Sequence, residues 1–384
     1  MIGGLNTAVR KAYARAGMLY ELHCDLLYQC DLDCEHCYLD DKARRILPTE
    51  FWRDVLSQAA TLGVFSVLFS GGEIFLRKDL LDLVAHARAL GLFVHLKSHG
   101  GHIDRAKADA LQALGVSTVW LSYYSTDPAI HDAITRKSGS HAKTRAALGH
   151  LSQAGLTTFA SVGVMARNEA TWQDAVADAR ALGALASVDG HMRAAHSGAD
   201  FPKQLAVDLA GLIAIEDSAI DPSLRGEVDC DPHPEPKPWD DSTSCGAGNV
   251  MLYIGPEGDV MPCVAWPMPI GNLATGDRLA DLWADSARLA QIQAYRRSDR
   301  VVCTACPVRD DCDFCAGQSW IETGDPLAAI QNVCLKTRAK TLAKAAALGL
   351  PEPPMPAGLT ADPATSPAAF PGARPRFPIR VVNR

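Results

Sequence analysis

Residues 28–38 read YQCDLDCEHCY and hold three thiols within eight residues: Cys30, Cys34 and Cys37. This stretch directly follows MLYELHC, a strand-like segment that begins at Met18. A structural zinc ion takes four protein ligands, so three thiols suit a metal centre that keeps one position open. The alternative is a zinc site whose fourth ligand is His36 or Cys24. The neighbouring motifs have to decide between the two.

The composition indicates an ordinary globular protein. The chain has 384 residues, of which 48% are hydrophobic and 21% charged, and its length fits two domains. Its net charge of -7 disfavours nucleic-acid binding. We find no signal peptide and no apolar run of membrane-spanning length, so we expect a cytoplasmic protein without a membrane partner. Twelve cysteines in such a chain indicate metal ligands rather than disulfides.

From residue 18 to 192, strand-like runs alternate with amphipathic helical patterns. The expected strands cover residues 18–24, 66–70, 92–98, 118–124, 157–164 and 186–192. Several helical patterns end on a glycine that suits a left-handed C-cap: Gly63, Gly91, Gly115, Gly155 and Gly183. Six β-then-α units predict a partial (β/α)6 TIM-like barrel with a parallel sheet. The chemistry of such sheets lies at the C-terminal strand ends, where the cysteine loop is found.

A second motif, Ser70-Gly71-Gly72-Glu73, follows the second expected strand. Its glycines allow a ligand to approach the backbone, and Glu73 can hold an amino group. With both motifs in this order, residues 18–215 resemble the radical S-adenosylmethionine (SAM) superfamily, although Ile74 stands where many members have proline. The resemblance implies a 4Fe–4S cluster on the three loop cysteines, with an open iron that binds SAM. SAM would be cleaved reductively to a 5′-deoxyadenosyl radical.

The same resemblance implies further SAM contacts. Gly71, Gly72 and Glu73 would lie by the amino group, and Ser122 and Arg136 would contact the ribose and the carboxylate. For Arg136, a solvated loop charge is the equal alternative. Four other polar residues near the expected strand ends are interpreted as exposed surface and left out of the site: His99, His102, His131 and Asp132. Cys24 is interpreted as a small core residue.

The C-terminal part carries seven more cysteines: Cys245, Cys263, Cys303, Cys306, Cys312, Cys315 and Cys334. Gly258 and Cys263 close an expected hairpin. Two CxxC pairs also fit a zinc ribbon. However, residues 241–340 resemble the SPASM extension of radical SAM enzymes, which binds one or two auxiliary iron–sulfur clusters, although the last CxxC has one residue fewer than the commonest pattern.

The crossing pattern of that family implies two ligand sets. A distal cluster would be bound by Cys303, Cys306, Cys312 and Cys334, and a nearer cluster by Cys245, Cys263 and Cys315. Met251 lies where some relatives have another cysteine. The nearer cluster is therefore completed by Cys230 or left with an open site.

Five segments follow from these assignments. They are an N-terminal extension (1–17), the radical SAM partial barrel (18–215), a linker (216–240), the SPASM domain (241–340), and a helix end with a proline-rich tail that we expect to be disordered (341–384).

SPASM relatives mostly act on ribosomally made peptides, so the resemblance implies an enzyme that crosslinks or oxidises a precursor peptide. Two further enzyme readings are an enzyme of tetrapyrrole biosynthesis and a sulfatase-type maturase. A third, of another class, is a non-catalytic zinc-binding scaffold. About 17 residues precede the first strand, so we expect a separate leader-binding protein or the enzyme's own surface to bind a leader peptide. We also expect an electron donor of the flavodoxin or ferredoxin type.

Overall fold

The computed structural model describes residues 2–39, 41–220 and 245–354. Its centre is a sheet of six parallel strands: β1 (Glu21–Leu27), β2 (Ser66–Gly71), β3 (Phe93–Ser98), β4 (Thr118–Ser122), β5 (Thr158–Gly163) and β6 (Leu185–Asp189). The strands lie in chain order, and β1 and β6 do not pair with each other. The predicted open, partial barrel is therefore confirmed.

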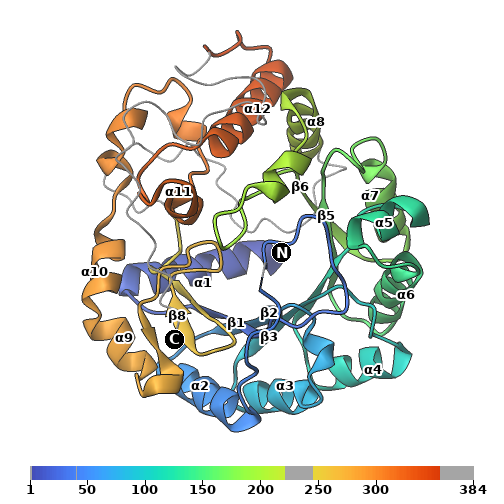
Figure 1. Ribbon diagram of the computed structural model, residues 1–384, viewed down its shortest axis with the longest axis vertical. Helices are drawn as coiled ribbons and strands as arrows, with labels where there is room; N and C mark the ends of the chain where they lie inside the picture. Colours follow the sequence, from blue (N-terminus) through green and yellow to red (C-terminus); the bar gives the residue numbers. More distant parts are fainter. Residues whose placement is uncertain (1, 40, 221–244, 355–384) are drawn as a thin grey trace.

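Helices cover the outer face of this sheet, as Figure 1 shows. They are α2 (Thr49–Thr61), α3 (Leu80–Ala89), α4 (Arg105–Ala113), α5 (Pro128–Thr135), α6 (Ser140–Gln153), α7 (Trp172–Ala181) and α8 (Leu209–Ile220). Alternate residues of β1 pack outward into the apolar core, among them Leu22, Cys24 and Leu26. Cys24 is fully buried there, so its interpretation as a core residue is confirmed. The predicted glycine caps are also confirmed, since all five glycines have φ between +70° and +86°.

The sheet continues beyond β1 with three strands from the C-terminal part of the chain. They are β7 (Met251–Ile254), β8 (Asp259–Met261) and β9 (Gly271–Asn272). Strand β7 pairs in parallel with β1 and antiparallel with β8, and Gly258 has φ +89° in the turn between β7 and β8. The hairpin was predicted, but its pairing with β1 was not. The pairing of β7 with β1 makes the C-terminal region part of the same nine-stranded sheet.

The remaining helices come from the N-terminal segment and from the chain that follows this hairpin. They are α1 (Ile2–Ala16), α9 (Leu279–Asp285), α10 (Ala287–Ala294), α11 (Ala316–Thr323) and α12 (Gln331–Leu348). Short 3-10 helices are η1 (Ile74–Leu76), η2 (Phe201–Leu205), η3 (Leu273–Thr275), η4 (Arg297–Asp299), η5 (Val301–Cys303) and η6 (Arg309–Asp311). Helix α12 packs along α8, as Figure 1 shows, so it joins the last barrel helix to the cysteine-rich region.

A buried polar network connects β1 with β7. The Tyr253 hydroxyl donates to Asp25 Oδ2 at 2.8 Å and lies 2.7 Å from the Tyr28 hydroxyl. His23 Nε2 lies 3.1 Å from the other oxygen of Asp25. All four side chains are buried. Because buried polar groups need partners, this network fixes the register between the two strands.

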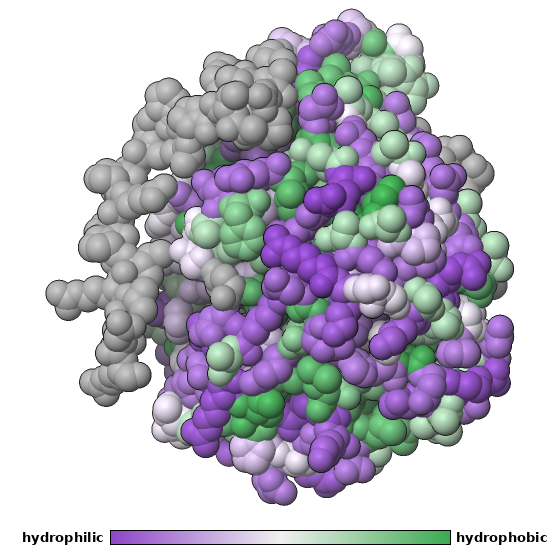
Figure 2. Space-filling view, turned by 45° about the vertical axis from the view of Figure 1, so that its right-hand side comes forward, coloured by the Kyte–Doolittle hydropathy of each residue, from purple (hydrophilic) through white to green (hydrophobic). Residues whose placement is uncertain are grey.

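The surface visible in Figure 2 is mostly hydrophilic, with hydrophobic residues scattered over it. Within the described ranges, no helix combines the length and the apolar character that crossing a membrane requires. Cys230 lies outside the described residues, and so does the expected proline-rich tail beyond residue 354.

Candidate functional site

The cysteine loop leaves the C-terminal end of β1 and carries Cys30, Cys34 and Cys37 on half-buried positions. The pKa of Cys34 is raised to about 12, mainly by burial and also by the neighbouring Cys37 and Cys30. The Leu32 backbone N–H donates to Cys30 Sγ at 3.4 Å. The structure therefore brings the three thiols together at the predicted edge of the sheet.

Acidic residues that alternate with these cysteines tie the loop to the barrel. Glu35, which is buried, accepts a two-pronged contact from Arg167 at 2.8 and 2.9 Å. Asp33 pairs with Lys42 and Arg136, both at 3.2 Å. The Glu35 pair is the stronger of these contacts, because the Asp33 side chain is 72% exposed and exposed pairs contribute little.

Gly71 and Gly72 allow the end of β2 to touch the start of the cysteine loop. A Cβ on Gly72 would lie 2.3 Å from the Gln29 carbonyl oxygen, and one on Gly71 would lie 2.0 Å from that of Leu27. The Glu73 N–H donates to the Gln29 carbonyl at 2.9 Å. We expected the glycines to admit a ligand. In the structure, the group that approaches them is the chain's own loop.

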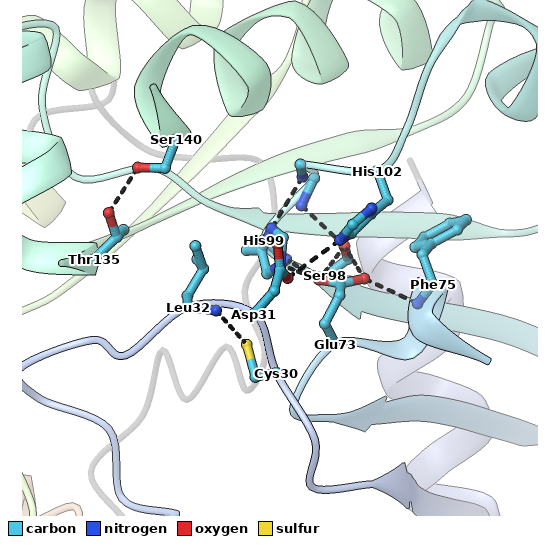
Figure 3. Close-up of polar contacts among 12 residues, drawn as sticks. Cys30, Asp31, Leu32, Glu73, Phe75, Ser98, His99, His102, Thr135 and Ser140 are labelled. Atoms are coloured by element: carbon cyan, nitrogen blue, oxygen red, sulfur yellow. Dashed lines mark hydrogen bonds and ion pairs between the residues drawn. The ribbon is translucent and has the colours of Figure 1, made fainter. Parts of the chain in front are cut away.

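Glu73 is fully buried and receives several hydrogen bonds, as Figure 3 shows. Its oxygens accept from the Phe75 N–H at 3.0 Å, the Ser98 hydroxyl at 2.9 Å and the His99 N–H at 3.0 Å. The carboxylate is thus held in one orientation at the ends of β2 and β3. Fixed placement of this kind is what positioning a ligand amino group requires.

His99 links Glu73 to the cysteine loop. Its Nδ1 accepts the Gly101 N–H at 3.0 Å, so the ring proton is on Nε2. That Nε2–H lies 2.9 Å from Asp31 Oδ1 and 3.1 Å from Glu73 Oε2. His102 Nε2 adds a contact of 3.2 Å to Asp31. Figure 3 shows the two histidines converging on Asp31.

The interpretation as exposed surface was therefore wrong for His99, His131 and Asp132, whereas the His102 side chain is 33% exposed. The His99 side chain is 10% exposed and His131 is 1% exposed, where it contacts the Ser140 hydroxyl at 3.1 Å. Asp132 accepts from the first residues of α6, and its side chain is 21% exposed. The position of His99 and His102 just after β3, at the chemically active end of the sheet, was the signal that could have identified them.

The predicted contacts of Ser122 with the SAM ribose and of Arg136 with the SAM carboxylate stay predictions. Ser122 ends β4 and is half-buried, next to Tyr124. Tyr124 itself reaches the cysteine loop, since its hydroxyl lies 3.1 Å from His36 Nε2. Arg136 ends α5 in the left-handed region, at φ 53°, and its side chain is 57% exposed beside Asp33.

The spacing of the thiols tests which metal group fits them. In a zinc site with bonds of about 2.3 Å, sulfur atoms lie about 4 Å apart. In the described part of the chain, the only group of three ligand atoms within 4.8 Å of one another is Cys30, Asp31 and His99. No three thiols meet that limit, nor do they with His36 or Cys24. Among the described residues, the thiols are therefore not gathered as closely as one zinc ion requires, which favours a larger group such as an iron–sulfur cluster.

The C-terminal cysteines gather in two groups. The Cys334 pKa is raised by burial and by thiolates at Cys312, Cys303 and Cys306. Burial raises the pKa of Cys263 to about 12, with further contributions from Cys315 and Cys245. These groups have the same members as the two ligand sets that the resemblance implies.

A cleft of about 170 Å³ opens beside Cys315, between the end of β6 and the C-terminal helices. His191 and Arg193 line it from the barrel, and Gln318 and Lys336 from α11 and α12. Burial lowers the pKa of His191 to about 4, so its ring is neutral where it contacts Gln318 Oε1 at 2.7 Å. The Arg193 guanidinium also lies over the Tyr38 ring, 5.6 Å from its centroid. The cleft therefore includes one C-terminal thiol, Cys315, and is connected to the cysteine loop through Arg193.

Two sequence families match the chain. The Radical SAM superfamily matches residues 26–180, and SPASM, an iron–sulfur cluster-binding domain, matches residues 245–307. The PqqA peptide cyclase of Streptomyces rochei is 34% identical over 364 residues, covering 90% of this chain and 96% of the relative. That of Xanthomonas campestris pv. campestris is 32% identical over 334 residues, covering 82% and 86%.

Solved structures share the fold. Streptococcus suis SuiB bound to its precursor peptide SuiA superposes with a TM-score of 0.65 at 19% identity, covering 84% of this chain and 78% of SuiB. The enzyme anSMEcpe with bound AdoMet and the Cp18Cys peptide gives a TM-score of 0.54 at 14% identity, covering 72% and 82%.

Proposed function

Because this chain belongs to the radical SAM superfamily and carries a SPASM region, we propose that it is a maturase that crosslinks or oxidises a ribosomally made peptide. The observation that carries the proposal is the joint presence of two features on one sheet. The three-thiol loop lies at the C-terminal edge of the partial barrel, and the region that carries two further thiol groups joins the same sheet through the β1–β7 pairing.

The cofactors are a 4Fe–4S cluster, SAM and auxiliary iron–sulfur clusters. Cys30, Cys34 and Cys37 would hold the first cluster, and bound SAM supplies a 5′-deoxyadenosyl radical that removes a hydrogen atom from the substrate. The chain's own part is to bind and to orient. Glu73, fixed by its hydrogen bonds, would orient the SAM amino group, and Ser122 and Arg136 would contact the ribose and the carboxylate.

The C-terminal thiols would hold two auxiliary clusters. Four cysteines complete the distal site: Cys303, Cys306, Cys312 and Cys334. The nearer site has Cys245, Cys263 and Cys315, and its fourth position is filled by Cys230 or left open. The cleft beside Cys315 would hold the reacting part of the peptide, because Cys315 lines it and Arg193, on its wall, contacts Tyr38 of the cysteine loop. A leader-binding protein and a flavodoxin-type or ferredoxin-type donor remain predicted partners.

Reconstituted protein, SAM and dithionite, incubated without oxygen with short peptides encoded beside its gene, test the proposal. We expect 5′-deoxyadenosine to form together with a peptide that has lost two hydrogens, as measured by mass spectrometry. A Cys30→Ala variant, prepared in the same way, should give neither product. If every peptide stays unchanged while a porphyrin precursor is consumed, the tetrapyrrole alternative replaces the peptide.

A further inference from the structure

Two arginines of the SPASM region are buried. Arg297 is 2% exposed and Arg300 is 3% exposed, and both lie in the short helical turns that lead to Cys303. Arginine is rarely buried to this extent without a charged partner, because removing a guanidinium from water costs several kcal/mol. The surroundings of these two side chains therefore indicate which anion they serve.

A thiol of the four-cysteine group contacts one of these two guanidinium groups directly. Arg300 Nη2 donates to Cys303 Sγ at 3.2 Å, and the guanidinium lies over the Phe314 ring, 3.2 Å from its centroid. Burial lowers the pKa of Arg297, and a thiolate at Cys312 opposes that shift. Arg300 is thus held against a sulfur atom by a short contact and by packing, while Arg297 Nη2 donates to the Arg309 carbonyl at 3.2 Å.

Two carboxylates of this region, among the residues that the structure describes, are exposed and have other cations beside them. Asp310 lies 3.6 Å from Arg309, and its side chain is 54% exposed. Asp313 lies 2.9 Å from Lys340 and is 52% exposed. Solvent weakens the field of such exposed groups more than that of half-buried thiolates.

We propose that Arg297 and Arg300 are the counter-ions of an iron–sulfur cluster held by Cys303, Cys306, Cys312 and Cys334, and that they raise its reduction potential. Four thiolates outweigh the positive charge of the iron–sulfur core, and reduction adds one more negative charge. Buried cations and hydrogen bonds to sulfur stabilise the reduced form more than the oxidised form. The inference rests on the proposed function only in requiring that these cysteines bind a cluster.

The cysteine loop has the opposite surroundings. Cys30 Sγ lies within 4.8 Å of a carboxylate oxygen of Asp31, and the buried Glu73 carboxylate is joined to Asp31 through His99. Negative charge beside a cluster favours its oxidised form and so makes it the better electron donor. The charges of this chain therefore favour electron donation at the loop and electron acceptance at the distal site. An electron lost by the peptide would reduce the distal cluster, and the accompanying proton would pass to water.

The test is the midpoint potential of the distal cluster in the full, reconstituted chain, measured by anaerobic redox titration with electron paramagnetic resonance. The signal that disappears in a Cys334→Ala variant identifies this cluster. In Arg300→Gln we expect the reduction equilibrium to shift at least tenfold toward the oxidised form, which is 59 mV lower for one electron. Arg300→Lys, which keeps the charge, should recover most of that difference.

Arg288→Gln is the matched control, because Arg288 is an exposed arginine of the same region. The midpoint potential of the distal cluster in this variant should equal that of the wild type. An unchanged potential in Arg300→Gln with full iron content overturns the proposal. If Arg300→Gln loses the cluster, Arg297→Gln replaces it, and an unchanged potential there is equally decisive. No peptide is needed, so this result is independent of whether the proposed peptide modification is found.

Discussion

Replacing Tyr253 with phenylalanine removes one hydroxyl from the buried contact between β1 and β7. That hydroxyl donates to Asp25 Oδ2 at 2.8 Å, so it accepts the hydrogen bond from Tyr28 at 2.7 Å. The variant therefore loses a donor to a buried carboxylate and leaves the Tyr28 hydroxyl without its acceptor. Hydrogen bonds to charged groups contribute about 1.5–3 kcal/mol and neutral ones about 1 kcal/mol. We expect a loss of about 3 kcal/mol in the free energy of unfolding.

Tyr28→Phe is the matched control, because it removes only the neutral donor and should cost about 1 kcal/mol. Both values come from urea titrations of the reconstituted protein under anaerobic conditions, compared with the wild type in one series. Hydrogen exchange of the β1 and β7 amides should accelerate more in Tyr253→Phe than in Tyr28→Phe. Equal effects of the two substitutions, or a loss below about 0.5 kcal/mol for Tyr253→Phe, would refute the reasoning.

Three further predictions concern the loop and the barrel. Gly72→Ala places a methyl group 2.3 Å from a loop carbonyl oxygen, so the variant should bind about four fewer irons per chain than the wild type. In the control Gly149→Ala, the nearest side-chain atom elsewhere in the chain is 3.9 Å from the added methyl group, and the iron content should be unchanged. Arg167→Met breaks the two-pronged contact to Glu35 and should lower the free energy of unfolding by about 1–2 kcal/mol, because Arg167 is half exposed and its partner is buried. Burial lowers the pKa of His131 from 6.5 to about 4, so below pH 6.5 the unfolded chain takes up the proton first and stability falls toward pH 4. The loss between pH 7 and pH 5 should be smaller in His131→Gln, and equal losses would contradict this.

The barrel was predictable because each element carries local signals. The alternation of strand-like runs with amphipathic helices that end at Gly63 or Gly183 repeats six times, and a parallel sheet follows from that repetition alone. The pairing of β7 with β1 was not predictable in this way. It joins Glu21 to Met251 across more than 200 residues, and no local pattern records such a contact.

The site residues that form a motif along the sequence were predictable, and those that meet only in the folded chain were not. Cys30, Cys34 and Cys37 are recognised by their distances along the chain. The role of His99 depends on contacts with Asp31 and Glu73, which are 68 and 26 residues away. A histidine in a loop gives no sequence signal for partners that only the folded sheet brings near it.

The protein's assignment as a radical SAM enzyme is tested most directly by 5′-deoxyadenosine formation alongside iron, sulfide and zinc content, on protein reconstituted without oxygen. We predict about eight to twelve irons per chain, little zinc, and reductive cleavage of SAM. The triple variant with Cys30, Cys34 and Cys37 all changed to alanine should lose about four irons and all cleavage. Stoichiometric zinc in a colourless protein that leaves SAM intact would contradict the assignment.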